Sequence, residues 1–291
     1  MCKCKKYKMA LEELMCRCYY QVLVSAKRDD NIFIPEGFGS SFLFAYKSYI
    51  FLISAEHVLS TSNCYFDLDS NKDYIGGIYT NKIIKLPNGQ FSPEMVCFFI
   101  DKEDYTKYFT WDNNRKKWVS KRADMFYYPI SNNPQFKGKE FLTQGQLDNN
   151  GNPIYYKLVK IVINEECISE PNSIHTYAIY GLVQNDIHKN QIIGKSIYHH
   201  GLTFLKKEKD SYFFSVSQYD ERLDKQQYWA GLSGTAVFDE ETGQVVGIAI
   251  MYDEKNYTLE VFPMKQICSI LDGYINSRAI KSDAFRCKKT L

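Results

Sequence analysis

Hydrophobic positions from Ile32 onward form short apolar runs or alternate with polar positions, and turn-forming residues separate one run from the next. Short strands at regular spacing, with turn signals between them, are typical of all-β barrels and sandwiches. About a dozen runs can be marked: Ser41–Tyr46, Tyr49–Ser54, Lys82–Leu86, Met95–Ile100, Met125–Ile130, Ile154–Ile163, Thr176–Val183, Gly201–Leu205, Tyr212–Ser217, Thr235–Phe238, Val245–Tyr252 and Thr258–Phe262. We therefore predict an all-β fold of two six-stranded antiparallel β-barrels.

Helical spacing of apolar residues returns only at the two ends of the chain. It predicts a helix over Leu11–Leu23 and a second helix that Pro263 opens and that continues through Ile275. The polar stretch Ser131–Asn152 is the predicted linker between the barrels. The expected parts are an N-terminal helical extension (1–30), a first barrel lobe (31–135), a second barrel lobe (136–262) and a C-terminal helix and tail (263–291), with insertions at Asp101–Lys121 and Asn185–Ser196.

Charge and hydropathy exclude several classes of protein. The formal net charge is +2, so no basic excess indicates a nucleic-acid groove. No apolar run approaches the ~18 to 20 residues of a membrane-spanning helix. The basic N-terminus is followed by Glu12 and Glu13 where a signal peptide needs an unbroken apolar stretch. We expect a cytoplasmic protein that binds neither nucleic acid nor a membrane.

Nine cysteines are scattered along the chain, and an odd, scattered set suits reduced thiols better than a disulfide framework. The pairs Cys2/Cys4 and Cys16/Cys18 could supply four thiolates to a zinc ion. One intervening residue is, however, tighter than the usual spacing of zinc ligands. We expect no metal and no cofactor, and a zinc-bound N-terminal module is the alternative.

Two short segments contain the residue types of nucleophilic catalysis. His57 follows the apolar run Ile50–Ile53, and Ser233 lies within Gly231-Leu232-Ser233-Gly234. A serine hydroxyl needs an imidazole to take its proton, and the imidazole needs a carboxylate to fix its tautomer. Glycine before such a serine permits a backbone that aims two N–H groups at a developing oxyanion. Together these segments favour catalysis by a serine, a histidine and an acid.

The same segments resemble those of the trypsin-like (chymotrypsin-fold) serine peptidases, and more closely their bacterial, disulfide-free branch. Gly39-Ser40-Ser41-Phe42 is similar to the family's G-[ST]-[GS]-F strand, and Ser54-Ala55-Glu56-His57-Val58 to its T-A-x-H-V segment. Gly231-Leu232-Ser233-Gly234-Thr235-Ala236-Val237 is similar to its G-[ND]-S-G-G-P-V segment. The resemblance covers most of Tyr19–Ile275 and implies chymotrypsin-like barrels and hydrolysis of peptide bonds.

The resemblance also implies a carboxylate between the histidine and the serine, on a segment where an Asp leads into a strand. Arg122-Ala123-Asp124-Met125-Phe126-Tyr127 is the best match and makes Asp124 the predicted carboxylate. The family usually has a small residue where this chain has Phe126, and Asp101 and Asp104 are rival candidates.

By the same resemblance, His57, Asp124 and Ser233 form the catalytic triad, and the N–H groups of Gly231 and Ser233 form the oxyanion hole. The first specificity pocket is implied at Gln227, Ile250, Met251 and Tyr252. No acid lies there to pair with a substrate Arg or Lys, so we expect a shallow pocket for a small or polar residue. If Ser217–Trp229 folds differently, these positions move out of register.

Leu232 stands where many family members have an Asp that pairs with a newly cut N-terminal amine. An apolar side chain cannot receive that ammonium, so we expect no activation by N-terminal cleavage.

The predicted function is therefore a serine endopeptidase that acts on a protein or peptide substrate and is controlled by a regulatory partner protein. The alternative is a catalytically inactive peptidase-like domain that binds a peptide or partner, which Phe126 and Thr235 favour as departures from the family pattern. The serine segment does not match the G-x-S-x-G elbow of the α/β-hydrolases, because Thr235 stands where that motif has its last glycine. We therefore do not expect a lipase or esterase. For the other histidines, His175, His188, His199 and His200, surface or core roles are expected rather than metal binding.

Overall fold

The structure is a computed structural model of the 291-residue chain. It describes residues 10–27, 33–58, 74–85, 87, 89, 91–99, 107–112, 117–130, 143–147, 153–156, 160–188, 191–216, 229 and 231–287.

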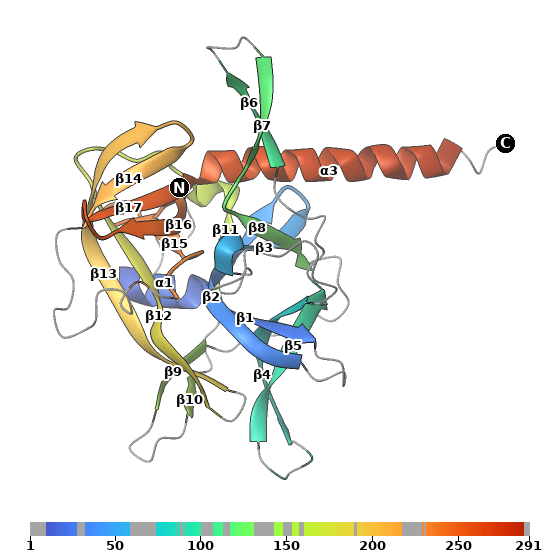
Figure 1. The fold of residues 1–291 in the computed structure, drawn as a ribbon, viewed down its shortest axis with the longest axis vertical. Coiled ribbons are helices and arrows are strands. Elements are labelled where there is room, and N and C mark those ends of the chain that lie inside the picture. The colour runs from blue at the N-terminus through green and yellow to red at the C-terminus, as the bar shows by residue number, and fades with distance from the viewer. Residues whose placement is uncertain are drawn as a thin grey trace.

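Six antiparallel strands of the C-terminal half close into a barrel in the order β12–β13–β14–β17–β16–β15 (Figure 1). Burial alternates along β14, where Tyr212 and Phe214 are buried while their neighbours are partly exposed. This closed barrel confirms one of the two predicted barrels. Its strands are β12 (Thr176–His188), β13 (Gln191–Glu208), β14 (Ser211–Ser215), β15 (Ala236–Asp239), β16 (Val245–Asp253) and β17 (Thr258–Pro263).

The first lobe is a sheet of seven strands in the order β5–β4–β1–β2–β3–β8, with β11 added in parallel to β2. Among the described residues, no pairing joins its edge strands β5 and β8, so the second predicted barrel is not confirmed. Its strands are β1 (Tyr19–Lys27), β2 (Phe33–Tyr46), β3 (Tyr49–Ser54), β4 (Tyr74–Lys85), β5 (Phe91–Phe99), β8 (Phe126–Pro129) and β11 (Ile163–Asn164).

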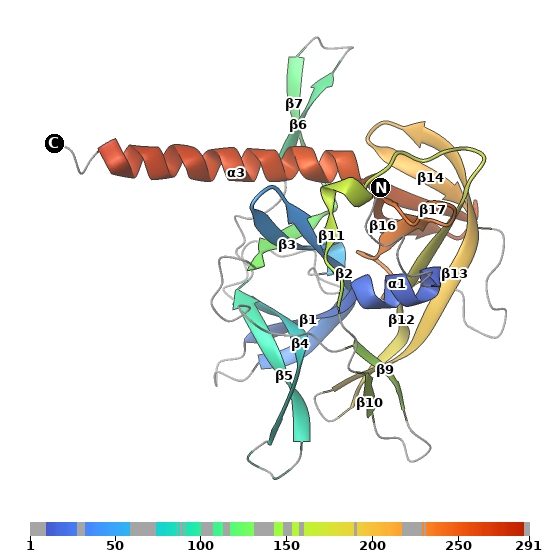
Figure 2. The same cartoon turned by 180° about the vertical axis from the view of Figure 1, so that it is seen from behind.

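Two hairpins project from opposite ends of the molecule (Figures 1 and 2). One pairs β6 (Lys107–Asp112) with β7 (Lys117–Arg122) inside the predicted first insertion. The other pairs β9 (Thr143–Leu147) with β10 (Pro153–Tyr156), so part of the predicted linker is a strand. The predicted second insertion, Asn185–Ser196, instead includes the paired ends of β12 and β13.

The N-terminal helix α1 (Leu11–Cys18) is shorter than the predicted Leu11–Leu23. From Tyr19 the chain becomes β1, because its backbone pairs with β2 on one side and β4 on the other. The end of the helix is held by Lys160, whose ammonium donates to the carbonyls of Cys16 (3.1 Å) and Tyr19. Tertiary pairing therefore overrides the helical spacing of the sequence.

The C-terminal helix α3 (Met264–Cys287) starts directly after Pro263, as predicted, and runs beyond the predicted Ile275. It crosses the first lobe beside β3 and β8 (Figures 1 and 2). Tyr274 lies edge-on to Phe51 and Tyr127, and Asp272 accepts a hydrogen bond from the Tyr46 hydroxyl (2.9 Å). No helix among the described residues is both long and apolar enough to cross a membrane.

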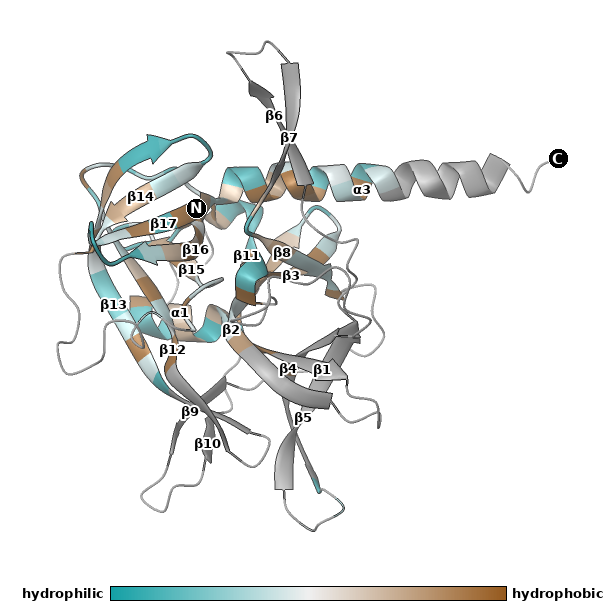
Figure 3. Cartoon of the chain, in the orientation of Figure 1, coloured by the Kyte–Doolittle hydropathy of each residue, from teal (hydrophilic) through white to brown (hydrophobic). Residues whose placement is uncertain are grey.

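One hydrophobic cluster joins the two lobes. It includes Phe42 and Phe44 of β2, Ala178 and Leu182 of β12, and Ile267 of α3. The barrel strands β15 and β16, which contribute to it, carry hydrophobic runs (Figure 3). Because both lobes bury side chains in this cluster, segments from both are held against each other where the candidate site lies.

Candidate active site

His57 and Asp124 form a close pair in the first lobe. His57 lies in a short 3₁₀ helix, η2 (Glu56–Val58), directly after β3, and Asp124 precedes β8, which pairs with β3. The imidazole Nδ1 lies 2.7 Å from Asp124 Oδ2, and the backbone N–H of His57 donates to Asp124 Oδ1 at 3.0 Å. With the carboxylate ionised, Nδ1 carries the proton, so Nε2 is the basic nitrogen of the ring.

Both side chains remain open to solvent, at 44% exposure for His57 and 35% for Asp124. Val58, the residue after His57, packs against the backbone of Gly39 in β2, in the space that a Cβ at Gly39 would take. Of the three candidate acids, Asp101 and Asp104 lie outside the described residues, and Asp124 lies at the imidazole.

The turn that contains Ser233 is bound to β2 of the first lobe. The backbone N–H of Ser40 donates to the carbonyl of Ser233 (3.1 Å), and the Ser40 hydroxyl donates to the carbonyl of Gly231 (2.5 Å). These two hydrogen bonds attach the serine segment of the second lobe to β2, which pairs with β3, the strand directly before the histidine segment.

Gly234 brings the serine turn against the histidine segment. Its φ is +88°, and an added Cβ would overlap the Ser40 carbonyl oxygen and lie 2.5 Å from Ser54 Oγ and 2.8 Å from Ala55 N. Ala55 is two residues before His57, and Gly234 directly follows Ser233. The close approach of these backbones, which only glycine permits, therefore places the Ser233 and His57 segments side by side.

The backbone of the turn is bonded at three further points. Leu232 N donates to Trp229 O (3.2 Å), Thr235 N to Leu232 O (3.0 Å) and Gly234 N to Ala249 O (2.8 Å). Within the described part of the chain, the N–H groups of Gly231 and Ser233 have no hydrogen-bond acceptor. They are thus available for a bound group.

Leu232 and Thr235 anchor the turn in the second lobe. The Leu232 side chain is buried in the hydrophobic core of the barrel and occupies the space beside Gly181. The Thr235 hydroxyl donates to the carbonyl of Tyr180 (2.5 Å). Apolar packing and a buried hydrogen bond, rather than an ion pair at Leu232, hold these side chains of the turn.

The predicted specificity residues fall in different environments. Gln227 lies outside the described residues, and Ile250 is buried in the cluster between the lobes. Met251 is 55% exposed. Tyr252 stacks on Trp229 with 4.3 Å between ring centroids, and this aromatic pair therefore spans from β16 to the start of the serine turn.

His199 is buried behind the same aromatic pair, with its ring 5.3 Å from that of Trp229. Burial lowers the pKa of His199 to about 4, because its charged form is desolvated and His200 lies nearby. His199 is therefore neutral at physiological pH. A neutral histidine offers no cation to a substrate carboxylate.

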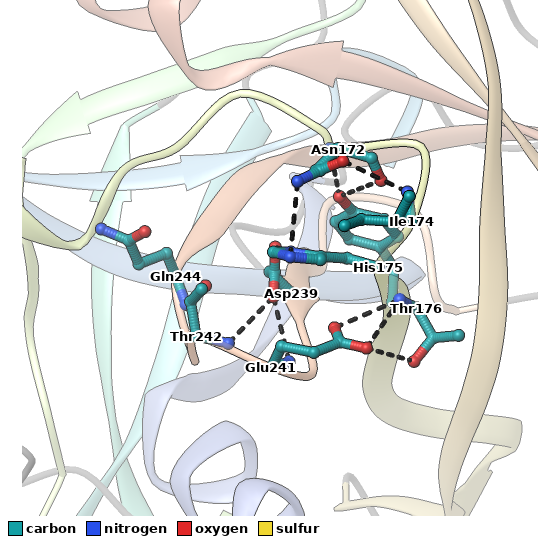
Figure 4. Close-up of polar contacts among 9 residues, drawn as sticks. Asn172, Ile174, His175, Thr176, Asp239, Glu241, Thr242 and Gln244 are labelled. Carbon is teal, nitrogen blue, oxygen red and sulfur yellow. Dashed lines mark hydrogen bonds and ion pairs between the residues drawn. The ribbon is translucent and has the colours of Figure 1, made fainter.

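A second histidine–carboxylate pair lies at the turn between β15 and β16 (Figure 4). His175 Nδ1 is 2.7 Å from the buried Asp239 Oδ2, and Asp239 Oδ1 accepts the backbone N–H groups of Glu241 and Thr242. Glu241 in turn accepts from the backbone N–H of Thr176. Ligand atoms of His175, Asp239 and Glu241 lie within 4.8 Å of one another, but these hydrogen bonds give the group a structural role in joining the turn to β12.

This pair predicts a pH-dependent stability. The hydrogen bond to Asp239 raises the pKa of His175 above its ordinary value of 6.5, so the stabilisation is complete below that value and is lost as the pH rises through the raised pKa. Denaturant unfolding of wild type and His175→Gln should give a larger difference at about pH 5.5 than at about pH 8.5. Equal differences at both pH values would contradict this assignment.

Cys16, Cys18, Cys167 and Cys268 form no disulfide within the part of the chain that the structure describes. Cys2 and Cys4, the other half of the candidate zinc site, lie outside the described residues.

From the sequence, Ser40 was only part of a strand motif, Gly181 and Trp229 had no role, and His199 was expected only at the surface or in the core, where it is indeed buried. Their contacts join segments far apart in the chain; Ser40 and Gly231, for example, are 191 residues apart. The only signal in the sequence was the glycine on either side of the Ser233 segment, and such a local pattern does not show which distant residue the segment contacts.

No protein-family model matches this chain, and no curated protein matches it. Among solved structures, a serine endoprotease from Yersinia pestis is similar over 93% of this chain and 68% of its own, at 12% identity and a TM-score of 0.42. The catalytically active tobacco etch virus protease is similar over 89% of this chain and 77% of its own, at 11% identity and a TM-score of 0.37. The tobacco vein mottling virus protease is similar over 88% of this chain and 81% of its own, at 11% identity and a TM-score of 0.36. All three TM-scores lie below 0.5, so we take the function from the geometry of the site.

Proposed function

We propose that this chain is a trypsin-like serine endopeptidase. In this proposal Ser233 is the nucleophile, His57 is the general base and then the general acid, and Asp124 orients the imidazole. The closed barrel and the first-lobe sheet would be the two halves of a chymotrypsin-like fold, with the site between them.

The observation that carries the proposal is the His57–Asp124 pair beside the serine turn. Asp124 binds both the ring Nδ1 and the backbone N–H of His57, which fixes the position and the tautomer of the ring. The close approach of Gly234 to Ser54 and Ala55, which leaves no room for a Cβ, supports the placement of Ser233 near this ring. A geometric constellation of this kind, rather than a motif, is what defines a catalytic triad.

The chemistry follows from these roles. Ser233 Oγ bonds to the scissile carbonyl carbon as its proton passes to His57 Nε2, and the π electrons of the carbonyl move to its oxygen. The N–H groups of Gly231 and Ser233 would bind that oxyanion. Collapse of the adduct breaks the C–N bond, and the leaving amine takes the proton from His57. Water then repeats the sequence on the acyl-enzyme and releases the acid.

The environment of the aromatic pair supports an uncharged residue at the first specificity position. The stacked rings of Trp229 and Tyr252 take up space between the serine turn and β16. His199 behind them is neutral because its pKa is about 4. We propose peptide substrates with a small or polar, uncharged residue before the cleaved bond.

The departures from the family pattern that favour an inactive binding domain have roles in the core. Phe126 packs with Tyr20, Leu43 and Leu52 on the far side of the first-lobe sheet, and the Thr235 hydroxyl is bonded to Tyr180. Neither observation assigns these side chains to the site, so we favour the enzyme over the binding domain.

Labelling by a fluorophosphonate tests the proposal directly. This reagent phosphonylates only a serine whose proton can be removed, so wild-type protein should be labelled at Ser233 and Ser233→Ala should not. Mass spectrometry of the labelled peptide identifies the residue. Folded wild-type protein that takes no label would favour the binding domain.

A further inference from the structure

Ser40 uses all three of its polar groups at the contact between the lobes. It is fully buried, and its N–H donates to Ser233 O, its hydroxyl to Gly231 O, and its carbonyl accepts from the Ser54 hydroxyl (2.7 Å). Two of these three hydrogen bonds go to the serine turn. A strand of the first lobe therefore holds the backbone of the turn in the second lobe.

These bonds orient successive peptide groups of the turn. The carbonyl of Gly231 is bound by the Ser40 hydroxyl, that of Leu232 by Thr235 N, and that of Ser233 by Ser40 N. Because all three carbonyls are occupied, the peptide planes of the turn cannot rotate independently. The N–H groups of Gly231 and Ser233 are the ones left without an acceptor among the described residues.

Gly231 is the position that most needs such a restraint. Its φ is +95°, and glycine has more accessible backbone conformations than any other residue. The Ser40 hydroxyl is the side-chain donor to this glycine, and at 2.5 Å the contact is short. Gly181 leaves room for the hydroxyl, because an added Cβ there would lie 3.0 Å from Ser40 Oγ and 2.6 Å from Leu232 Cδ2.

We propose that the Ser40 hydroxyl is a positioning residue for catalysis, which holds the Gly231–Leu232 peptide so that the N–H groups of Gly231 and Ser233 converge on the substrate oxyanion. The inference rests on the proposed peptidase function. Ser40 does not touch the reacting atoms and acts through the backbone of the turn.

Ser41 provides a matched control for the loss of a buried hydroxyl. It is the next residue of β2, is 1% exposed, and donates to the carbonyl of Tyr20 (3.1 Å), a contact that lies within the first lobe. Ser40→Ala and Ser41→Ala each remove one buried hydroxyl and its bond to a carbonyl. A purely structural role of Ser40 would give the two variants similar properties.

The experiment compares wild type, Ser40→Ala and Ser41→Ala of the full chain, with a peptide substrate and with the matching peptide aldehyde, which forms a tetrahedral adduct with the serine. Both variants should have similarly lowered melting temperatures. Only Ser40→Ala should lower kcat, by about tenfold, with KM within about twofold of wild type. Its inhibition constant for the aldehyde should rise by the same factor, because the adduct contains the oxyanion.

Three results would overturn the inference. They are wild-type kcat in Ser40→Ala, equal losses of kcat in both variants, or a loss confined to KM. If Ser40→Ala does not fold, Ser40→Cys keeps the volume with a weaker donor, and unchanged kcat there would also overturn it. Failure of the proposed function is separate, because wild type itself would then show neither turnover nor labelling at Ser233.

Discussion

Replacing Ser233 or His57 by Ala should lower turnover by about 10⁴- to 10⁶-fold, and Asp124→Ala by about 10⁴-fold. The first two changes remove the nucleophile or its base. The third removes the carboxylate that lies 2.7 Å from Nδ1 and fixes the tautomer. All three side chains are partly exposed, so folding should persist. Steady-state kinetics on a cleaved peptide, with circular dichroism for folding, measure the effect.

The pair His175–Asp239 is the matched control, because its Nδ1–Oδ2 distance is also 2.7 Å. His175→Ala should leave turnover unchanged below the unfolding temperature, which separates catalysis from the loss of a His–Asp contact. Full activity in Ser233→Ala would end the peptidase proposal. Wild-type turnover in Asp124→Ala would show that another carboxylate, with Asp101 and Asp104 the candidates, orients His57.

Gly234→Ala should lower the free energy of unfolding by at least about 3 kcal/mol and should lower turnover of the folded fraction at least about 100-fold. An added Cβ would overlap the Ser40 carbonyl and lie within 2.8 Å of Ala55 N, so either the serine turn or the histidine segment must move. Displacement of the nucleophile by about 1 Å is enough for such a loss of rate. Denaturant titration and single-turnover kinetics test the two parts.

Gly201→Ala separates this overlap from backbone strain. Gly201 also has positive φ, +75°, but a Cβ there meets no atom within 4 Å. Its replacement should cost only the strain of about 1 kcal/mol and should leave turnover intact. Equal effects of the two substitutions would mean that the close approach at Gly234 does not position the serine.

The strands and the pieces of the site could be predicted because their signals are local. Alternation of hydrophobic and polar residues has the period of a strand, and it gave Tyr49–Ser54 with the bounds that the structure has. The positions of Gly234 directly after Ser233 and of Ala55 two residues before His57 are likewise given by the sequence. The resemblance to a family motif, rather than such a pattern, implied Asp124, which lies at the imidazole.

The predicted helix over Leu11–Leu23 was wrong beyond Cys18, because a local pattern says nothing about which strands compete for the same backbone. Tyr19 and the residues after it satisfy helical spacing, yet hydrogen bonds to β2 and β4 on both sides stabilise a strand there. The prediction of two closed barrels was confirmed for only one. Closure depends on pairing between edge strands distant in sequence, which alternation does not encode.

The sequence by itself determined which side chains could act as nucleophile, base and acid, and that strands would flank them. Only the tertiary structure decided what surrounds them: the Ser40 hydroxyl on Gly231, Leu232 packed beside Gly181, and the stack of Tyr252 on Trp229. The physical reason is that these contacts bring together segments from both lobes or from distant strands of one lobe. Their geometry arises from the packing of whole sheets and leaves no periodic mark on any single segment.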